Sequence, residues 1–459
     1  GVAARMAKAQ PDPTDDGNGG GVGPASVNLG SQNFSFTAPV LSLNGRAGLG
    51  VSLAMTYNSK VWNLDSANSK MFFNADKGYP GPGWRLGFGV IQGKPGTGGA
   101  TVPYTNSVSG KNSYIYISPD GSRHDLAYNS TTGLYESYDS SYMDFNDGTT
   151  KVLRMMNGTR ITFGTSYDYQ YLPTEIKDRN GNKITITNAA IVNGDGVGSN
   201  NDVTIDYVTD TMGRKIDFYY ESNRLVRIRQ LRNSDSVNPA NWGSYPKDNA
   251  AWFNYAKIDY AAVTVSTNFS GLTLDPSGIN NSTIYLPSSV TYPTGNNYRF
   301  YYTSYAQMWA IEKWAPTVAG QGTERSIAYT TYALPSINGV SYPSRSGAMS
   351  DSTAKGDCPA FTGRTEQAEN WNGGTAVAYS YNVTVPSDST VTDPAGRIYR
   401  SQSGTLSQTT TIYADAAAYT AGTYLKRFTT TYEDDGLGYQ SNVRQTEITV
   451  ESQRRKPLP

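Results

Sequence analysis

The chain has 459 residues, of which 37% are hydrophobic, 17% charged and 12% aromatic, and its 38 Lys and Arg balance 38 Asp and Glu. A neutral chain lacks the basic surplus with which proteins neutralise nucleic-acid phosphates, so we expect no nucleic-acid partner. It contains no run of about 18 apolar residues, which excludes a membrane-spanning helix. The 35 Tyr and 47 Gly favour strands joined by tight turns over long helices.

The first 32 residues are rich in Gly, Pro and Asp and show no apolar periodicity, which predicts a flexible arm over residues 1–32. Ala7-Lys8-Ala9 has the small-x-small form of a signal-cleavage site but lacks the apolar stretch that precedes one. We therefore expect a chain that begins inside a longer precursor, or a fragment. The only cysteine, Cys358, excludes an intramolecular disulfide framework.

An N-terminal β region is predicted over residues 33–232. Residues 34–37 and 51–57 alternate apolar and polar side chains, which is typical of strands with one buried face. Residues 78–84 contain too many glycines and prolines for a central strand, so we expect Trp84 to anchor a loop on the sheet.

A short unit then recurs along the chain: a turn containing Gly, one or two polar residues, and an alternating strand. Gly permits the positive φ of a primed hairpin turn, so the repetition predicts a meandering antiparallel sheet built from hairpins. The turns are centred on Asp120-Gly121, Asp147-Gly148, Asn157-Gly158, Asn180-Gly181, Met212-Gly213, Thr294-Gly295 and Ala395-Gly396. Strands are expected after them, including residues 161–163, 184–186, 216–220 and 298–302.

Two stretches interrupt this rhythm. Residues 233–289 are predicted to be an insertion, with one short helix at residues 249–260. A second β region follows over residues 290–459, and it contains a loop-rich insertion at residues 316–372. A helical turn is expected at residues 414–418, and Thr- and Tyr-rich strands at residues 423–450.

Three segments resemble the RHS/YD-repeat family of large secreted β-shell proteins. They are Leu53-Ala54-Met55-Thr56-Tyr57-Asn58-Ser59, similar to a strand near the start of the shell; Gly81-Pro82-Gly83-Trp84-Arg85-Leu86, similar to the Gly-x-Gly-Trp segment that follows it; and Val208-Thr209-Asp210-Thr211-Met212-Gly213-Arg214-Lys215-Ile216, similar to a YD unit. Residues 391–397 resemble the start of another unit. The likeness covers roughly residues 33–311.

The resemblance implies an all-β fold, in which an antiparallel hairpin meander winds as a spiralling YD-repeat-like sheet or shell with few short helices. It also implies a structural protein, secreted or at the cell surface, that encloses or displays a protein cargo such as a toxin. The family's self-cleaving closing segment and its C-terminal effector domain have no counterpart here. We therefore expect the opening part of a shell, or a shell-like chain with another use.

Catalytic chemistry has little support in the sequence. His124 is the only histidine, and in a strand it would share a face with Ser122 while Asp125 points the other way, so these three cannot form a relay. Cys358 lacks a neighbouring base, which favours an inert thiol. We expect no enzyme activity, no cofactor and no metal.

Two other functions remain open. A self-assembling extracellular filament or tube subunit could use residues 1–32 or the Thr-rich end for strand addition to a further copy of itself. A carbohydrate-binding protein or glycosidase could stack cell-surface glycans on tryptophan rings, although core packing is the commoner role of tryptophan in a β protein. The candidate residues are Trp242, Trp252, Trp309, Trp314 and Trp371.

Overall fold

The structure is a computed structural model, and it describes residues 25–28, 33–65, 68–106, 109–192, 197, 201–267, 269, 271–316, 325–333, 362–369, 372–385, 387–436 and 441–453. Strands dominate these ranges, accompanied by one six-residue α-helix, α2 (Ala416–Ala421). The brief 3-10 segments are η1 (Arg46–Gly48), η2 (Thr97–Gly99), η3 (Ser234–Val237), η4 (Pro239–Ser244) and η6 (Asn372–Gly374). The predicted all-β fold with few short helices is confirmed.

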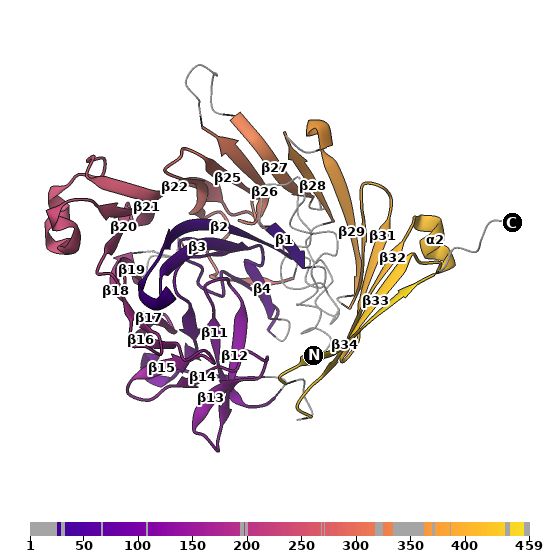
Figure 1. The fold of residues 1–459 in the computed structure, drawn as a ribbon, viewed down its shortest axis with the longest axis horizontal. Coiled ribbons are helices and arrows are strands. Elements are labelled where there is room, and N and C mark those ends of the chain that lie inside the picture. Colours follow the sequence, from indigo (N-terminus) through magenta and orange to yellow (C-terminus); the bar gives the residue numbers. More distant parts are fainter. Residues whose placement is uncertain are drawn as a thin grey trace.

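Most of the described strands belong to one 25-stranded antiparallel sheet in which, apart from β7, successive strands are also neighbours in the sheet. Its strands are β7 (Val90–Gln92), β10 (Tyr104–Thr105), β11 (Asn112–Ile117), β12 (Arg123–Asn129), β13 (Leu134–Ser137), β14 (Asp144–Asn146), β15 (Lys151–Arg154), β16 (Arg160–Tyr167), β17 (Gln170–Lys177), β18 (Lys183–Val192), β19 (Asn201–Thr209), β20 (Lys215–Glu221), β21 (Arg224–Leu231), β22 (Trp252–Thr264), β24 (Thr283–Thr291), β25 (Asn297–Tyr302), β26 (Met308–Ala315), β27 (Arg325–Ala333), β28 (Gly363–Ala368), β29 (Val377–Val385), β30 (Asp388–Thr392), β31 (Ile398–Ser403), β32 (Ser407–Tyr413), β33 (Lys426–Glu433) and β34 (Arg444–Ser452). Figure 1 shows this sheet curving around as a shell. The predicted hairpin meander is therefore confirmed.

Six of the seven recurring turns share a geometry that differs from the predicted primed hairpins; the turn at Asp147-Gly148 is the exception. Between β17 and β18, the Gly181 amide donates to the Asp178 carbonyl at 3.2 Å and the Asp178 amide donates to the Asn182 carbonyl at 3.0 Å. Gly181 has φ of 87°, while the two residues before it have negative φ. This is a type I turn with a glycine bulge, whereas a type I′ turn would place both central residues at positive φ.

The aspartate that opens such a turn holds it together. The Asp178 carboxylate oxygen Oδ1 accepts hydrogen bonds from the amides of Asn180 and Asn182 at 2.8 and 2.9 Å. The turns that begin at Asp210 and Asp393 repeat both bonds. The Asp-x-x-Gly motif is therefore a self-bonded turn, in which the acid satisfies two amides that the bulge leaves outside the ladder.

The first part of the large sheet closes on itself. The three-residue strand β7 pairs with β11 on one side and with β17 on the other. Together with the unbroken pairing from β11 to β17, this makes a small closed barrel whose interior is filled by apolar and aromatic side chains. The buried residues are Ile91, Tyr114, Tyr116, Leu126, Tyr135, Met143, Phe145, Leu153, Ile161, Phe163 and Tyr171.

A second, four-stranded sheet lies inside the curve of the first, in the order β1 (Ala25–Asn28), β2 (Asn33–Leu43), β3 (Val51–Asn58) and β6 (Trp84–Arg85). Figure 1 shows these indigo strands surrounded by the later ones. Phe34 stacks on Tyr332 of β27 with ring centroids 3.9 Å apart, and Phe36 packs edge-on against Phe300 of β25. The largest core cluster therefore lies between the inner sheet and the strands that curve around it.

Two smaller sheets complete the fold: β4 (Trp62–Asp65), β5 (Lys70–Phe73) and β23 (Thr273–Asp275) form one, and β8 (Lys94–Pro95) with β9 (Thr101–Val102) the other. The first carries a second core around Trp62, whose indole nitrogen donates to the Tyr305 carbonyl at 2.8 Å. Trp84 is fully buried and donates to the Tyr302 hydroxyl at 2.8 Å, as expected of an anchoring residue.

One predicted element is wrong. The helix expected at residues 249–260 is strand β22, because Ala256 and Ile258 alternate with exposed residues and face the main core. The helical turn expected at residues 414–418 overlaps α2, which begins at its Asp415 cap. Strands β22 and β24 carry the large sheet through residues 233–289; the domain boundaries stay a prediction.

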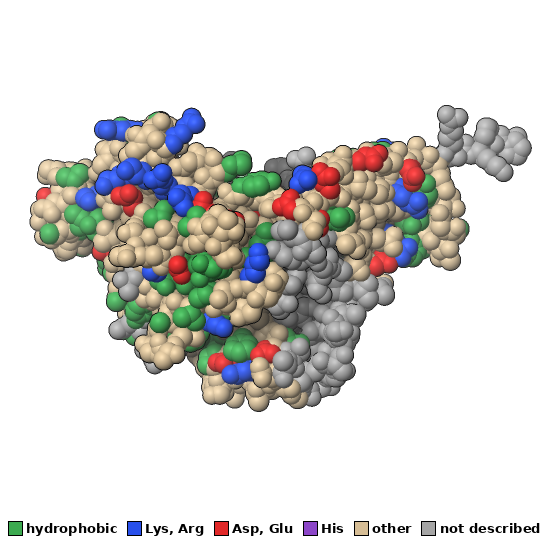
Figure 2. All heavy atoms as spheres, turned by 90° about the horizontal axis from the view of Figure 1, so that it is seen from below, with side chains coloured by type: hydrophobic (Ala, Val, Ile, Leu, Met, Phe, Trp, Pro, Cys, Tyr) green, Lys and Arg blue, Asp and Glu red, His purple; other side chains and the backbone are tan. Residues whose placement is uncertain are grey.

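The end of the large sheet returns to its beginning. Figure 1 places the yellow strand β34 beside the barrel that contains β13. Figure 2 shows charges of both signs on the surface seen from below, with basic side chains gathered on the side where Figure 1 places β18–β22. Among the described residues, no helix is long and apolar enough to span a membrane.

Candidate functional site

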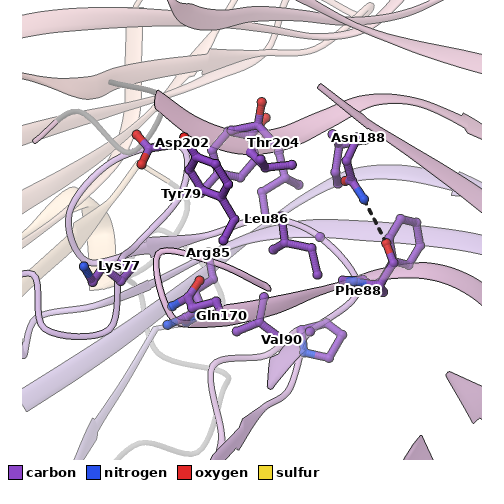
Figure 3. Close-up of a pocket in the computed structure, with 18 of the residues that line it drawn as sticks. Lys77, Tyr79, Arg85, Leu86, Phe88, Val90, Gln170, Asn188, Asp202 and Thr204 are labelled. Atoms are coloured by element: carbon purple, nitrogen blue, oxygen red, sulfur yellow. Dashed lines mark hydrogen bonds between the residues drawn. The ribbon is translucent and has the colours of Figure 1, made fainter. Parts of the chain in front are cut away.

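A cavity of about 90 Å³ lies where the closed barrel, the inner sheet and the β18–β19 hairpin meet. Its middle is apolar, with Leu86, Phe88 and Val90 contributed by the segment that leads from β6 into β7 (Figure 3). Polar side chains surround this middle: Tyr79, Asp202 and Thr204 lie together, and Gln170 and Arg85 lie apart from them (Figure 3). Such a mixture is typical of ligand pockets.

Most of the polar groups around the cavity are held by other protein groups. Lys77 Nζ lies 2.5 Å from Asp168 Oδ2, and the Asn188 amide donates to the Pro173 carbonyl at 3.1 Å (Figure 3). Gln170 donates to the Asp76 carbonyl at 3.1 Å. Burial lowers the pKa of the Arg85 guanidinium to about 10, opposed by the charge of Asp76. The arrangement supports packing between three layers.

No sequence motif indicated this cavity. Its lining comes from β6, β7, the β11–β12 turn, β17, β18 and β19, so it forms only when segments more than 100 residues apart assemble. Lys77, Asp168 and Tyr169 have positive φ, which is uncommon for residues other than Gly and Asn. Backbone conformations of this kind are fixed by the fold and leave no motif.

Trp242 and Trp252 lie in the core of a side lobe formed by η3, η4 and the start of β22. They are only 8% and 6% exposed, and their rings meet edge to face with centroids 5.8 Å apart. The Arg229 guanidinium covers the Trp252 ring at 3.8 Å. This placement favours the packing role that the sequence left open for these two residues.

Trp309 and Trp314 both lie on the outer face of the β25–β26 hairpin, where Tyr301 and Glu312 connect them. Trp309 is 39% exposed and lies beside Tyr301, which is 38% exposed, with ring centroids 6.3 Å apart. Glu312 Oε2 accepts hydrogen bonds from the Tyr301 hydroxyl at 2.6 Å and from the Trp314 indole at 2.8 Å. The sequence did not single out Tyr301 and Glu312. Trp371 and Cys358 lie outside the described residues.

His124 does not form a catalytic relay with its neighbours in the chain. Its Nδ1 lies 2.7 Å from Asp139 Oδ2, while Asp125 accepts a hydrogen bond from Asn106 instead. The Ser141 hydroxyl donates to the other oxygen of this acid, Asp139 Oδ1. In the described part of the chain, no group of three or more His, Cys, Asp or Glu side chains is arranged to hold a metal ion.

A comparison with protein-family models and with curated proteins gives no match. Among solved structures, the chain is similar to the TcdB2–TccC3 complex with Cdc42 at 13% identity and a TM-score of 0.31, covering 81% of this chain and 18% of that one. The TcdB2–TccC3 complex alone gives 13% identity, a TM-score of 0.31 and coverages of 80% and 20%. The Tc holotoxin pore of Photorhabdus luminescens gives 10% identity, a TM-score of 0.24 and coverages of 93% and 19%. The chain thus spans about a fifth of the length of these proteins, and likeness at this level assigns no function.

Proposed function

We propose that the chain is a structural wall segment of an extracellular β-shell that encloses or displays a protein cargo. The observation that carries this proposal is the course of the 25-stranded sheet, which curves around an inner sheet until its last hairpin touches the barrel at its start. A backbone-bonded meander of this length is stiff, because almost every strand is bonded on both sides. The proposed role needs that stiffness and needs no reactive side chain.

The inner face of the last strands supports the same proposal. Cross-strand register places Ile448 and Val450 of β34 on the same face as Tyr399, which packs against the main core. These two side chains are 55% and 58% exposed. Apolar side chains on the concave side of a shell are suited to contact an enclosed polypeptide.

Electron microscopy of the purified full chain, with intact-mass analysis of every polypeptide that co-purifies, tests the proposal. Hollow particles accompanied by a second polypeptide that resists added protease are the expected result. Fibres or solid particles containing this chain alone would rule out enclosure and leave an architectural role.

Glycan binding is a second candidate, supported by the exposed ring pair of Trp309 and Tyr301 beside Glu312. Sugars stack on exposed aromatic faces and bond flanking carboxylates. We expect Trp309→Ala to abolish any glycan-dependent change in tryptophan fluorescence. The control is Tyr128→Ala, which removes an equally exposed ring, 40%, from the barrel. Equal loss in both variants, or no signal in the native chain, would remove this candidate.

Filament assembly is a third candidate, supported by β34, whose residues are all exposed in a strand paired on one side by β33. An exposed edge can accept a strand from another copy. The added strand would come either from residues 1–32 or from the Thr-rich end of another copy, and deletion of residues 1–32 distinguishes these two alternatives. Loss of assembly would identify the arm as the donor strand, and unchanged assembly would exclude it.

A further inference from the structure

The last described hairpin is joined to the barrel by hydrogen bonds between residues 302 to 304 positions apart in the chain. The Asn442 amide donates to the Tyr138 carbonyl at 2.5 Å. In return, the Ser140 amide donates to Asn442 Oδ1 at 3.1 Å, and the Ser140 hydroxyl donates to the Val443 carbonyl at 2.8 Å. We call this set, formed by Tyr138, Ser140, Asn442 and Val443, the closing contact.

The only histidine of the chain sits next to the closing contact. His124 of β12 bonds Asp139 Oδ2, and Asp139 lies between the two residues, Tyr138 and Ser140, that make the contact. The other oxygen of Asp139 accepts from the Ser141 amide at 3.2 Å and from the Ser141 hydroxyl. Asp139 therefore links the imidazole directly to the β13–β14 loop that touches the last hairpin.

The surroundings of the ring favour its charged form. The ring stacks on Tyr116 of β11 with centroids 5.9 Å apart, and the carboxylates that face it are Asp139 from the loop, Asp120 from the β11–β12 turn and Asp125 from β12 itself. The hydrogen bond to Asp139 raises the pKa of His124 above its usual value; burial opposes this, and the charges of all three acids add to it.

We propose that the His124–Asp139 pair is a pH-sensitive clamp on the closing contact, which is tightest in mildly acidic solution and loosens as the pH rises. Protonated His124 holds Asp139, and with it Ser140, in the position that bonds Asn442 and Val443. The neutral ring retains a weaker hydrogen bond and releases the loop to move. The clamp acts whether or not the shell holds a cargo.

The direction of the pH effect on the clamp follows from the titration of His124 and of Asp139. Because the folded pKa of His124 is raised above 6.5, its contribution to the closed state is complete below that pH and is lost as the pH rises through the folded value. Burial raises the pKa of Asp139, but its bonds to His124 and Ser141 lower it below 3.8 overall, so the carboxylate stays charged above that pH. Both side chains are therefore charged, and the clamp is complete, between the pKa of Asp139 and that of His124. Both side chains are partly exposed, so we expect a change of about two- to fivefold in opening.

Hydrogen–deuterium exchange of the full chain tests the clamp. The peptides that cover residues 441–452 are followed at pH 5.5 and pH 8.0, with rates corrected for the intrinsic pH dependence of amide exchange. We expect protection to be about two- to fivefold greater at pH 5.5 in the native chain. In His124→Asn, where the amide can donate to Asp139 without titrating, the ratio should be close to one.

A Cys358→Ser background removes the thiol as a second titrating group, and Asp139→Asn provides a second variant that keeps the shape of the pair without its charge. Peptides from β15 and β16, on the other side of the barrel, report any general pH effect on exchange. Equal protection at the two pH values in the native chain would overturn the clamp. So would a pH ratio that survives in both variants.

Discussion

The guanidinium of Arg214 donates a hydrogen bond of 2.5 Å to the main-chain carbonyl of Asn44, 170 residues earlier in the chain. The same side chain bonds Asp210 at 2.6 Å, and Asp210 is fully buried at the start of its turn. Thr211 of this turn adds two bonds to the tip of the inner hairpin, accepting from the Arg46 amide and donating to the Leu49 carbonyl. One YD-like turn of the outer sheet therefore fixes the position of the inner sheet.

Replacing Arg214 with Ala is expected to lower the free energy of unfolding by about 1–3 kcal/mol, because it breaks charged hydrogen bonds at both Asp210 and Asn44. The matched control is Arg397→Ala in the turn that begins at Asp393, where the arginine is exposed. That change should cost less than about 0.5 kcal/mol. Chemical denaturation of the two variants measures both values. Equal costs would mean that the contact with the inner hairpin contributes nothing.

Two glycines with similar φ should differ sharply when changed to Ala. Gly213 has φ of 82° and open space where a Cβ would lie, so Gly213→Ala should cost about 1–2 kcal/mol from backbone strain alone. Gly83 has φ of 79°, and its Cβ would meet Tyr57 at 2.6 Å and Val61 at 2.7 Å. Gly83→Ala should therefore cost about 3–5 kcal/mol. Thermal unfolding distinguishes them, and similar melting temperatures would contradict the clash.

The buried pair Arg229–Asp217 predicts a large loss of stability on truncation. Its side chains are 4% and 10% exposed and lie 2.6 Å apart, and Arg229 also stacks between Tyr219 and Trp252. Arg229→Ala should cost about 3–5 kcal/mol, because it leaves a buried carboxylate without its cation. Arg154→Ala, which breaks a pair that is 43% and 33% exposed, should cost no more than about 1 kcal/mol. Urea midpoints that fall together would refute this ranking.

His124 gives a titration that can be read without assignment, because the chain has no other histidine. We expect its imidazole signals in nuclear magnetic resonance to titrate above 6.5, since the hydrogen bond to Asp139 raises the pKa. In Asp139→Asn, that pKa should fall, as the bond to a carboxylate and its charge are both lost. A native pKa at or below 6.5 would show that the bond to Asp139 does not stabilise the charged imidazole in solution.

Local sequence predicted the strands well, because their alternation depends only on which face is buried. Residues 184–186 and 216–220 lie in β18 and β20, and their inward side chains Ile184, Ile186, Ile216 and Phe218 belong to the main core. The turn type was wrong for a local reason. Asn180-Gly181 fits a primed hairpin by composition, but Asp178 offers a carboxylate to two amides and stabilises a longer turn.

Long-range closure could not be predicted. β7 has only three residues, and nothing in Val90-Ile91-Gln92 indicates pairing with both β11 and β17. Of the candidate tryptophans, Trp242 and Trp252 are buried whereas Trp309 is exposed, and the sequence analysis did not distinguish them. Whether a tryptophan is buried depends on which distant segments pack against it, and the local sequence does not specify those segments.

The enclosed position of the β2–β3 hairpin has a consequence during synthesis. Phe34, Phe36 and Phe300 end in one core, but Phe300 is made long after the first two. Ribosomes add about 5–20 residues per second, so even Ile184, roughly 150 residues after Phe36, emerges about 7–30 s later. Throughout that interval the apolar face of the nascent β2–β3 hairpin is exposed to solvent. Slowing translation or depleting chaperones should therefore divert this protein into aggregates before the strand that contains Ile184 has been made.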